Sequence, residues 1–192
     1  MNETIFYHVL PASGQTFYTS EFVRVGTVIR AEGTPELCGA FPHASKRAID
    51  ALTYHRGVFV FEGVILRGNV IHDDSKSCAN ERETVWMLTP QQTLLVLRKW
   101  AQWCVEQAKR YVNNYDADDY ATRAADYAVA AATEHEDKYI IYAAIRASDY
   151  SLDAVCSAFR ASGRPFCRYD FTDVQNAELE RLIALAVKGE LM

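Results

Sequence analysis

Residues 84–111, TVWML-TPQQ-TLLVLRKWAQWCVEQAKRY, contain the point at which the chain changes from strand to helix. Thr89, Pro90 and Gln92 stand at the N-cap, N1 and N3 positions of a capping box, in which the threonine hydroxyl and the glutamine side chain each bind an orphan amide. Apolar residues then recur every three or four positions, which predicts a long amphipathic helix. They are Leu94, Leu97, Trp100, Ala101, Cys104, Ala108 and Tyr111. We therefore predict two parts, a β-rich domain over 1–88 and a helical bundle over 89–192.

The first part is predicted to be rich in strands. Short runs of β-branched and aromatic residues, separated by glycine and proline, are typical of strands. These runs cover residues 4–10, 16–25, 27–31, 58–66, 70–72 and 84–88, with a polar loop over 73–80. Residues 45–56 have helical spacing instead, which predicts one short helix with Ser45 as its cap.

The second part is predicted to be helical throughout. Helices are expected over 116–133 and 137–147, followed by one capped by Asp149 or Ser151 that ends at 162–165. A second capping box, Thr172 to Gln175, predicts a last helix that runs to Lys188. Five helices with short links favour antiparallel packing. The expected fold class is α+β, with a small β-rich half and an antiparallel helical bundle.

The composition is that of an ordinary globular protein. Of the 192 residues, 49% are hydrophobic and 23% are charged. We find neither a secretory leader nor an apolar stretch long enough to cross a membrane, so we expect a cytoplasmic protein without a membrane partner. The five cysteines form no C-x-x-C pair, which argues against a disulfide framework or a zinc ribbon.

Charge and tyrosine are concentrated in one region. Residues 116–153 hold nine acidic and three basic side chains, which disfavours direct contact with nucleic acid and favours a basic protein partner. Tyrosines lie among the acids, and tyrosine is enriched at protein interfaces. The predicted partner-binding residues are Asp116, Asp118, Asp119, Tyr120, Asp126, Tyr127, Glu134, Glu136 and Asp137. The alternative is a solvated face that keeps an alanine-rich bundle in solution.

Two weaker patterns concern chemistry. Cys38 and His43 are residue types that bind zinc or form a nucleophile pair, and His55 and His72 could complete a zinc site. No second close pair of ligands accompanies them, so we expect neither a metal nor a cofactor. His8, Ser45 and Glu83 follow, in chain order, the pattern of small ADP-ribosyltransferases, in which a late glutamate of an E-x-E motif stabilises the reacting centre. The pattern gives an alternative catalytic set.

A longer pattern carries a family resemblance. It begins with Cys38-Gly39-Ala40-Phe41-Pro42-His43-Ala44 and the helical segment 48–54, and it continues through a strand ending at Gly68 to residues 73–76 and Glu81-Arg82. This segment, within 26–88, resembles a domain of unknown function found in phage and bacterial proteins. Residues 100–104 and 175–182 are similar to the alanine-rich helical tails that often follow it. The resemblance implies a phage or mobile-element origin and no particular activity.

These observations lead to one hypothesis and two alternatives. We expect a non-enzymatic, phage-type accessory protein that binds a host protein through the acidic helices. Its target would be a defence effector, as for anti-CRISPR proteins, or another nucleic-acid-binding protein in the host cytoplasm. The first alternative is an ADP-ribosyltransferase-like enzyme. The second is a self-assembling structural protein that buries its tyrosines in a homo-oligomer.

Overall fold

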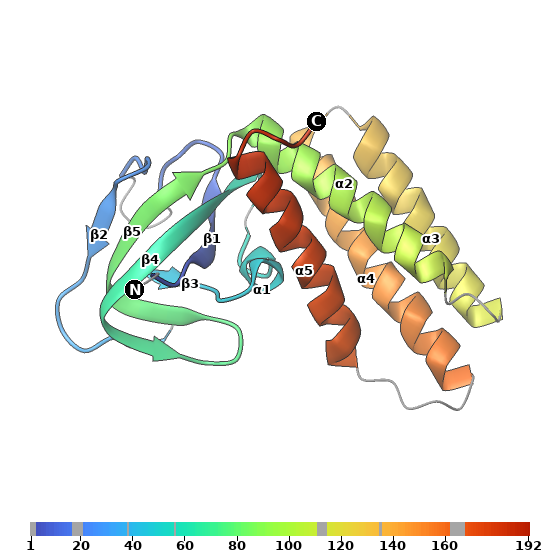
Figure 1. The fold of residues 1–192 in the computed structure, drawn as a ribbon, viewed down its shortest axis with the longest axis horizontal. Coiled ribbons are helices and arrows are strands. Elements are labelled where there is room, and N and C mark those ends of the chain that lie inside the picture. The colour runs from blue at the N-terminus through green and yellow to red at the C-terminus, as the bar shows by residue number, and fades with distance from the viewer. Residues whose placement is uncertain are drawn as a thin grey trace. The chain divides into compact units, whose positions relative to one another are not determined.

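A computed structural model describes residues 3–16, 21–37, 39–55, 57–110, 115–134, 136–161 and 168–192, without the side chains of 115–118, 161 and 168–170. The chain separates into two compact units, Met1–Thr93 and Leu94–Met192. The first contains the strands and one short helix, and the second contains the long helices (Figure 1). The predicted α+β class, with a β-rich half followed by a helical bundle, is confirmed.

The first unit is built on an antiparallel sheet. Its elements are β1 (Phe6–Pro11), β2 (Val28–Arg30), β3 (His43–Ala44), α1 (Ala48–Leu52), β4 (Phe59–His72) and β5 (Ser77–Met87). The strand order is β1-β4-β5-β2, and β3 pairs with β5 beside that path. Strands β4 and β5 therefore form the long central hairpin to which the shorter strands add.

The sheet closes on itself. Ser45, which directly follows β3, exchanges two backbone hydrogen bonds with Tyr7 of β1, at 2.7 and 2.8 Å. Strands β1, β4, β5 and β3 thus form a closed ring. The long strands can bend around it because their pairing shifts register after Gly63 and after Arg67, and such irregularities increase bending and twist. Gly68, at φ 80, provides a left-handed backbone position at the second shift.

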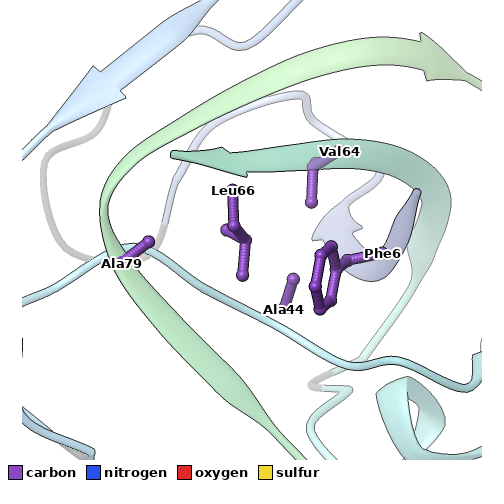
Figure 2. Packing of buried hydrophobic residues seen from close by; sticks show 5 residues of the cluster. All are labelled: Phe6, Ala44, Val64, Leu66 and Ala79. Atoms are coloured by element: carbon purple, nitrogen blue, oxygen red, sulfur yellow. The ribbon is translucent and has the colours of Figure 1, made fainter. Parts of the chain in front are cut away.

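Two apolar clusters fill the inner face of this ring. The first contains Phe6, Ala44, Val64, Leu66 and Ala79, whose side chains converge in the space enclosed by β4 and β5 (Figure 2). The second contains Leu10, Val23 and Val60. Side chains alternate between the faces of a strand, so His8, between Phe6 and Leu10, points to the same inner face. Polar residues therefore lie between the two clusters.

The second unit is a bundle of the helices α2 (Pro90–Lys109), α3 (Tyr115–Thr133), α4 (Asp137–Ala161) and α5 (Arg168–Val187). Alanine is frequent among the buried residues of α3 and α4, and Ala124, Ala131, Ala144 and Ala147 are fully buried. Helix α2 is tied to α3 by a bond of 2.8 Å from Arg98 Nε to the Ala131 carbonyl. It is tied to α5 by a bond of 3.0 Å from the Trp100 indole to the Gln175 carbonyl.

The predicted start of α2 is confirmed. The Gln92 amide donates to Thr89 Oγ1 at 3.2 Å, and the Thr89 amide donates to Gln92 Oε1 at 2.9 Å. The capping box is thus reciprocal, as the sequence of residues 89–92 predicts.

The predicted helix boundary near residue 149 is wrong. In the described part of the chain, four helices follow residue 88 instead of five, because α4 runs without a break through Asp149 and Ser151. The Ser151 hydroxyl donates to the Ala147 carbonyl at 2.7 Å, four residues back, so it binds within the helix instead of capping one. Arg146 and Asp149 form an i,i+3 ion pair along the same helix.

The second predicted capping box is also wrong. Helix α5 begins at Arg168, so Thr172 and Gln175 lie inside it. Gln175 is buried and its amide donates to the Ser148 carbonyl of α4 at 3.1 Å. A threonine followed three residues later by a glutamine is compatible with a helix start and with the interior of a helix. Tertiary packing decides which of the two forms. The predicted helix end at 162–165 lies outside the described residues.

Smaller differences affect the first unit. The loop predicted over 73–80 is short, because β5 already begins at Ser77. Residues 21–25 form only an isolated bridge, from Phe22 to Gln15, and a turn closed by hydrogen bonds between Arg24 and Thr27 follows. Ser45 does not cap α1, since Arg47 holds the N-cap position and Ser45 pairs with Tyr7.

Candidate interaction surface

The tyrosines of α3 and α4 form one continuous stack. Tyr120 and Tyr127 are seven residues apart on α3, and Tyr142 and Tyr150 are eight apart on α4, so each pair lies along one helix face. The Tyr150 ring stacks on Tyr127 with centroids 5.4 Å apart and on Tyr120 at 6.4 Å. Tyr142 meets Tyr127 edge-on at 6.0 Å. These four residues are called the tyrosine stack below.

Two arginines accompany the tyrosine stack. Arg146 lies with its guanidinium carbon 5.0 Å from the centre of the Tyr150 ring, and Arg123 lies 5.9 Å from it. Arg146 also donates to the Tyr150 hydroxyl at 3.2 Å. Burial is the largest single influence and opposes the charge of Arg146, but the interactions with Tyr150, Tyr127 and Tyr142 together outweigh it and raise the pKa of Arg146. These arginines were not among the predicted site residues, although Tyr142, Arg146 and Tyr150 follow one another at helical spacing.

The acidic residues of the predicted set whose side chains are described fall into two groups. In the first, Asp119 pairs with Arg123 at 3.2 Å and Glu136 pairs with Lys138 at 3.2 Å. In the second, Asp126, Glu134 and Asp137 make no ion pair with any described residue of the chain. Asp126 and Glu134 are exposed and Asp137 is half-buried. The second group therefore carries charge that the described residues of its own chain do not neutralise.

The remaining predicted partner residues have different positions. Asp116 and Asp118 belong to α3, and their side chains lie outside the described residues. Tyr139, which is 50% exposed, lies beside the stack, and the Lys138 amine lies 4.8 Å from the centre of its ring. The structure thus brings the described members of the predicted set to the α3–α4 pair and the turn that joins its helices.

A buried charge network occupies the inner face of the first unit. Glu62 is completely buried and accepts hydrogen bonds from His8 Nδ1 at 2.7 Å and from the Thr84 hydroxyl at 2.8 Å. Arg82, also buried, lies 3.4 Å from the same carboxylate and donates to the His43 carbonyl at 3.0 Å. The sequence signal for this network is Glu62 alone, a charged residue within an otherwise apolar strand.

This network fixes the charge state of its members. Burial raises the pKa of Glu62, but the Arg82 charge and the bonds from His8 and Thr84 outweigh it and hold that pKa at about 2. Burial and the Arg82 charge lower the pKa of His8. His8 is therefore neutral at pH 7, and its Nδ1 proton points to Glu62. The His8 side chain is 25% exposed.

The alternative catalytic set is not brought together. His8 faces the inside of the ring beside Glu62, whereas Glu83 pairs across β4 with Ile65, on the outer face. Glu83 forms an ion pair with Arg67, which also contacts Glu3 and Glu81. Ser45 is buried and makes the backbone bridge to Tyr7. The three residues of the transferase pattern therefore do not converge.

The candidate zinc ligands of the sequence are not seen together among the described residues. Cys38 lies outside them, while His43 pairs with Cys78 in the sheet. Within the described ranges, no three His, Cys, Asp or Glu side chains are arranged to hold a metal ion. A shallow open depression lies on the first unit, lined by Thr4, Ile65, Arg67 and His72 among others. Among the helices of the described chain, none is both long enough and apolar enough for a membrane crossing.

The comparisons with known proteins give no relative. No family model matches the chain, and neither a curated protein nor a solved structure does. The functional argument therefore rests on the residues of this chain alone.

Proposed function

We propose that the protein works by binding a basic protein through the surface of α3 and α4. The observation that carries this proposal is the group Asp126, Glu134 and Asp137, whose carboxylates have no ion pair within the described chain. These acids belong to α3, to α4 and to the turn between them, the same two helices that carry the tyrosine stack. Charges left uncompensated on one surface attract a partner of opposite charge and speed its association.

The exposed tyrosines favour a binding surface over a face that only keeps the bundle in solution. A face that served only to keep the bundle in solution would need charges but no aromatic rings. Here Tyr142 is 53% exposed and Tyr139 is 50% exposed. Tyrosine provides a large rigid contact area at a low entropic cost, together with a polar tip. Acidic side chains around exposed rings are suited to a partner that presents lysine or arginine among apolar residues.

The biological role that we propose is that of a phage-type accessory protein acting in the host cytoplasm. This origin is proposed on the sequence pattern that runs from Cys38 to Arg82. An acidic surface that competes with phosphates for a basic groove would inhibit a nucleic-acid-binding protein, such as a bacterial defence effector of the kind that anti-CRISPR proteins block. The same surface would repel nucleic acid itself. The alternative is that these tyrosines are buried between copies of the chain in a homo-oligomer.

The test is an affinity capture from bacterial lysate at low and at high salt, with mass spectrometry of the bound proteins and light scattering of the purified protein. We expect a stoichiometric basic protein that salt releases, because exposed charges are screened over about 8 Å at physiological ionic strength. A monomeric protein that retains no stoichiometric partner at low salt would contradict the proposal. A stable homo-oligomer that hides Tyr142 would favour self-assembly instead.

A further inference from the structure

The ring of strands in the first unit has one weak closure. Strand β1 pairs with β4 along its whole length, whereas within the described residues it meets the segment after β3 only through the bridge between Tyr7 and Ser45. Two backbone hydrogen bonds, at 2.7 and 2.8 Å, make this bridge, which is called the seam below. Phe6 and Ala44 flank the seam and belong to the first apolar cluster (Figure 2). The seam therefore joins the two sides of that cluster.

A histidine stands beside the seam on each of its two strands. His8 is next to the seam on β1, and His43 lies on β3 just before it. Arg82 of β5 interacts with both strands. It lies 3.4 Å from the Glu62 carboxylate, which accepts a hydrogen bond from His8, and it donates to the His43 carbonyl at 3.0 Å. A positive charge on either histidine would therefore lie near the positive charge of Arg82.

The surroundings of His8 oppose its protonation. Burial has the largest effect on the pKa of His8 and lowers it, and the Arg82 charge on β5 lowers it further. Glu62 on β4 acts in the opposite direction, because its carboxylate attracts a proton to His8, but burial and Arg82 outweigh it. His43 on β3 adds to the lowering.

The surroundings of His43 act in the same way. Burial is the main cause of its lowered pKa, and the positive charges of Lys76 and Arg82 add to it. Asp73, in the turn between β4 and β5, is the negative charge that opposes them. Both histidines are therefore neutral at pH 7, and each would gain its proton close to a cation.

The remaining charged groups beside the seam do not reverse this balance. Helix α1 packs against β1, and Asp50 of α1 lies 3.8 Å from Arg47 at the start of that helix. These two opposite charges offset each other. Lys46, which directly follows the seam, is exposed to solvent and adds a positive charge. Protonation of the histidines therefore leaves an excess of positive charge at the seam.

We propose that the seam is an acid-sensitive closure of the ring, which opens when His8 and His43 gain protons. Histidine is the side chain whose charge changes between pH 5 and pH 8. Like charges on both sides of the seam repel each other, and only the two hydrogen bonds of the bridge hold β1 to the segment after β3. Proteins open locally at such places at a lower cost than that of global unfolding. The longer pairings of β4 with β1 and with β5 stay intact.

The opening goes beyond the proposed function, because it concerns the first unit and not the surface of α3 and α4. It would detach β3 and Ala44 from β1 and expose the apolar cluster around Phe6 to solvent. The first unit would thus change its surface in mild acid while the helical unit stays folded.

The experiment measures amide hydrogen exchange of the full-length protein by NMR at pH 7 and at pH 5. Rates are divided by the intrinsic rate at the same pH, which gives protection factors. The amides of Tyr7 and Ser45 donate the two bonds of the seam and report on it directly. We expect the protection of both to fall at least about tenfold at pH 5, since one unit of pKa corresponds to a factor of ten. Amides of the β4–β5 hairpin and of α2 should change by less than about twofold.

Variants assign the effect to the two histidines. His8→Gln/His43→Gln removes both titrating groups and should make the protection of the seam equal at the two pH values. His55→Gln removes a histidine of the same unit that bonds to a carbonyl of α1, and as the matched control it should keep the fall. Circular dichroism checks that each variant is folded. His43→Gln alone changes a half-buried position and should reduce the fall even where the double variant does not fold.

Three results would overturn the proposal. The first is equal protection of the seam at both pH values in the parent. The second is a loss of protection that the β4–β5 hairpin and α2 share, because the protein would then unfold as a whole. The third is a fall that persists in the double variant. The capture experiment on α3 and α4 tests the proposed function separately.

Discussion

Glu62 shows how one residue determines the interior of the strand-rich unit. Its carboxylate is fully buried between two apolar clusters, and it is kept ionised by Arg82, His8 and Thr84. Removing one member of a buried ion pair leaves the other charge uncompensated. Glu62 therefore stabilises the unit mainly because its removal would leave the buried Arg82 charge without a partner.

We predict that Glu62→Gln lowers the free energy of unfolding by about 3 kcal/mol, because Arg82 would remain buried without its counter-charge. Urea denaturation followed by circular dichroism measures this change. Glu32→Gln, at an exposed position without an ion pair in the described chain, is the matched control and should differ from the parent by less than about 0.5 kcal/mol. An unchanged midpoint for Glu62→Gln would show that the network adds no net stability.

The same residues predict a dependence of stability on pH. Burial and the Arg82 charge lower the pKa of His8 from 6.5, so the folded protein binds this proton less readily than the unfolded chain does. Stability from His8 is therefore complete above pH 6.5 and falls as the pH drops below it. His43, whose pKa is lowered by burial and by the Lys76 charge, acts in the same direction. Glu62 adds a second loss of stability as the pH falls from 4.5 toward 2, since its pKa in the folded protein is about 2.

Urea denaturation between pH 8 and pH 4 tests this prediction. His8→Gln should reduce the slope of the free energy of unfolding against pH below pH 6.5. It should not abolish this slope, because His43 still contributes. A stability that is constant between pH 7 and pH 5 would be incompatible with a neutral His8 in the folded state.

At the scale of elements, the sequence predicted best where local hydrogen bonds decide the structure. The start of α2 depends on Thr89 and Gln92, which satisfy each other's amides within four residues. The same pattern at Thr172 and Gln175 gave a wrong helix start, because α5 begins earlier and Gln175 binds Ser148 on another helix. Strand β3, only two residues long, was missed because its pairing with β5 joins segments more than thirty residues apart. Long-range packing overrides local propensity at these places.

The cap of α2 gives a prediction at this scale. Thr89→Ala should lower the free energy of unfolding by about 1 kcal/mol, because the Gln92 amide loses its acceptor. Thr89→Ser retains the hydroxyl and should remain close to the parent. Thermal melts of both variants provide the comparison, and equal melting temperatures for alanine and serine would show that solvent replaces the cap at no cost.

For the whole molecule, the sequence predicted the fold class and which region holds the acidic and tyrosine residues, but it did not predict how these residues pair. Composition alone cannot tell that Asp119 is paired with Arg123 while Asp126 has no ion pair in the described chain, since both are acids on α3. It also placed His8 and Glu83 in one hypothetical site, whereas strand alternation puts them on opposite faces of the sheet. Which residues form ion pairs, and on which face of the sheet a residue lies, depend on how the helices and strands pack and pair.

The central claim is that uncompensated acids on α3 and α4 bind a basic protein. The most direct test is the dissociation constant between the basic partner captured from lysate and the variant Asp126→Asn/Glu134→Gln/Asp137→Asn. The control is Glu32→Gln/Glu36→Gln/Asp74→Asn, which removes the same charge from exposed positions of the first unit. We predict that the first variant binds at least about tenfold more weakly, mainly through slower association and a reduced dependence on salt, while the control binds as the parent does. Equal weakening by both variants would mean that only net charge matters, and it would contradict a docking site on α3 and α4.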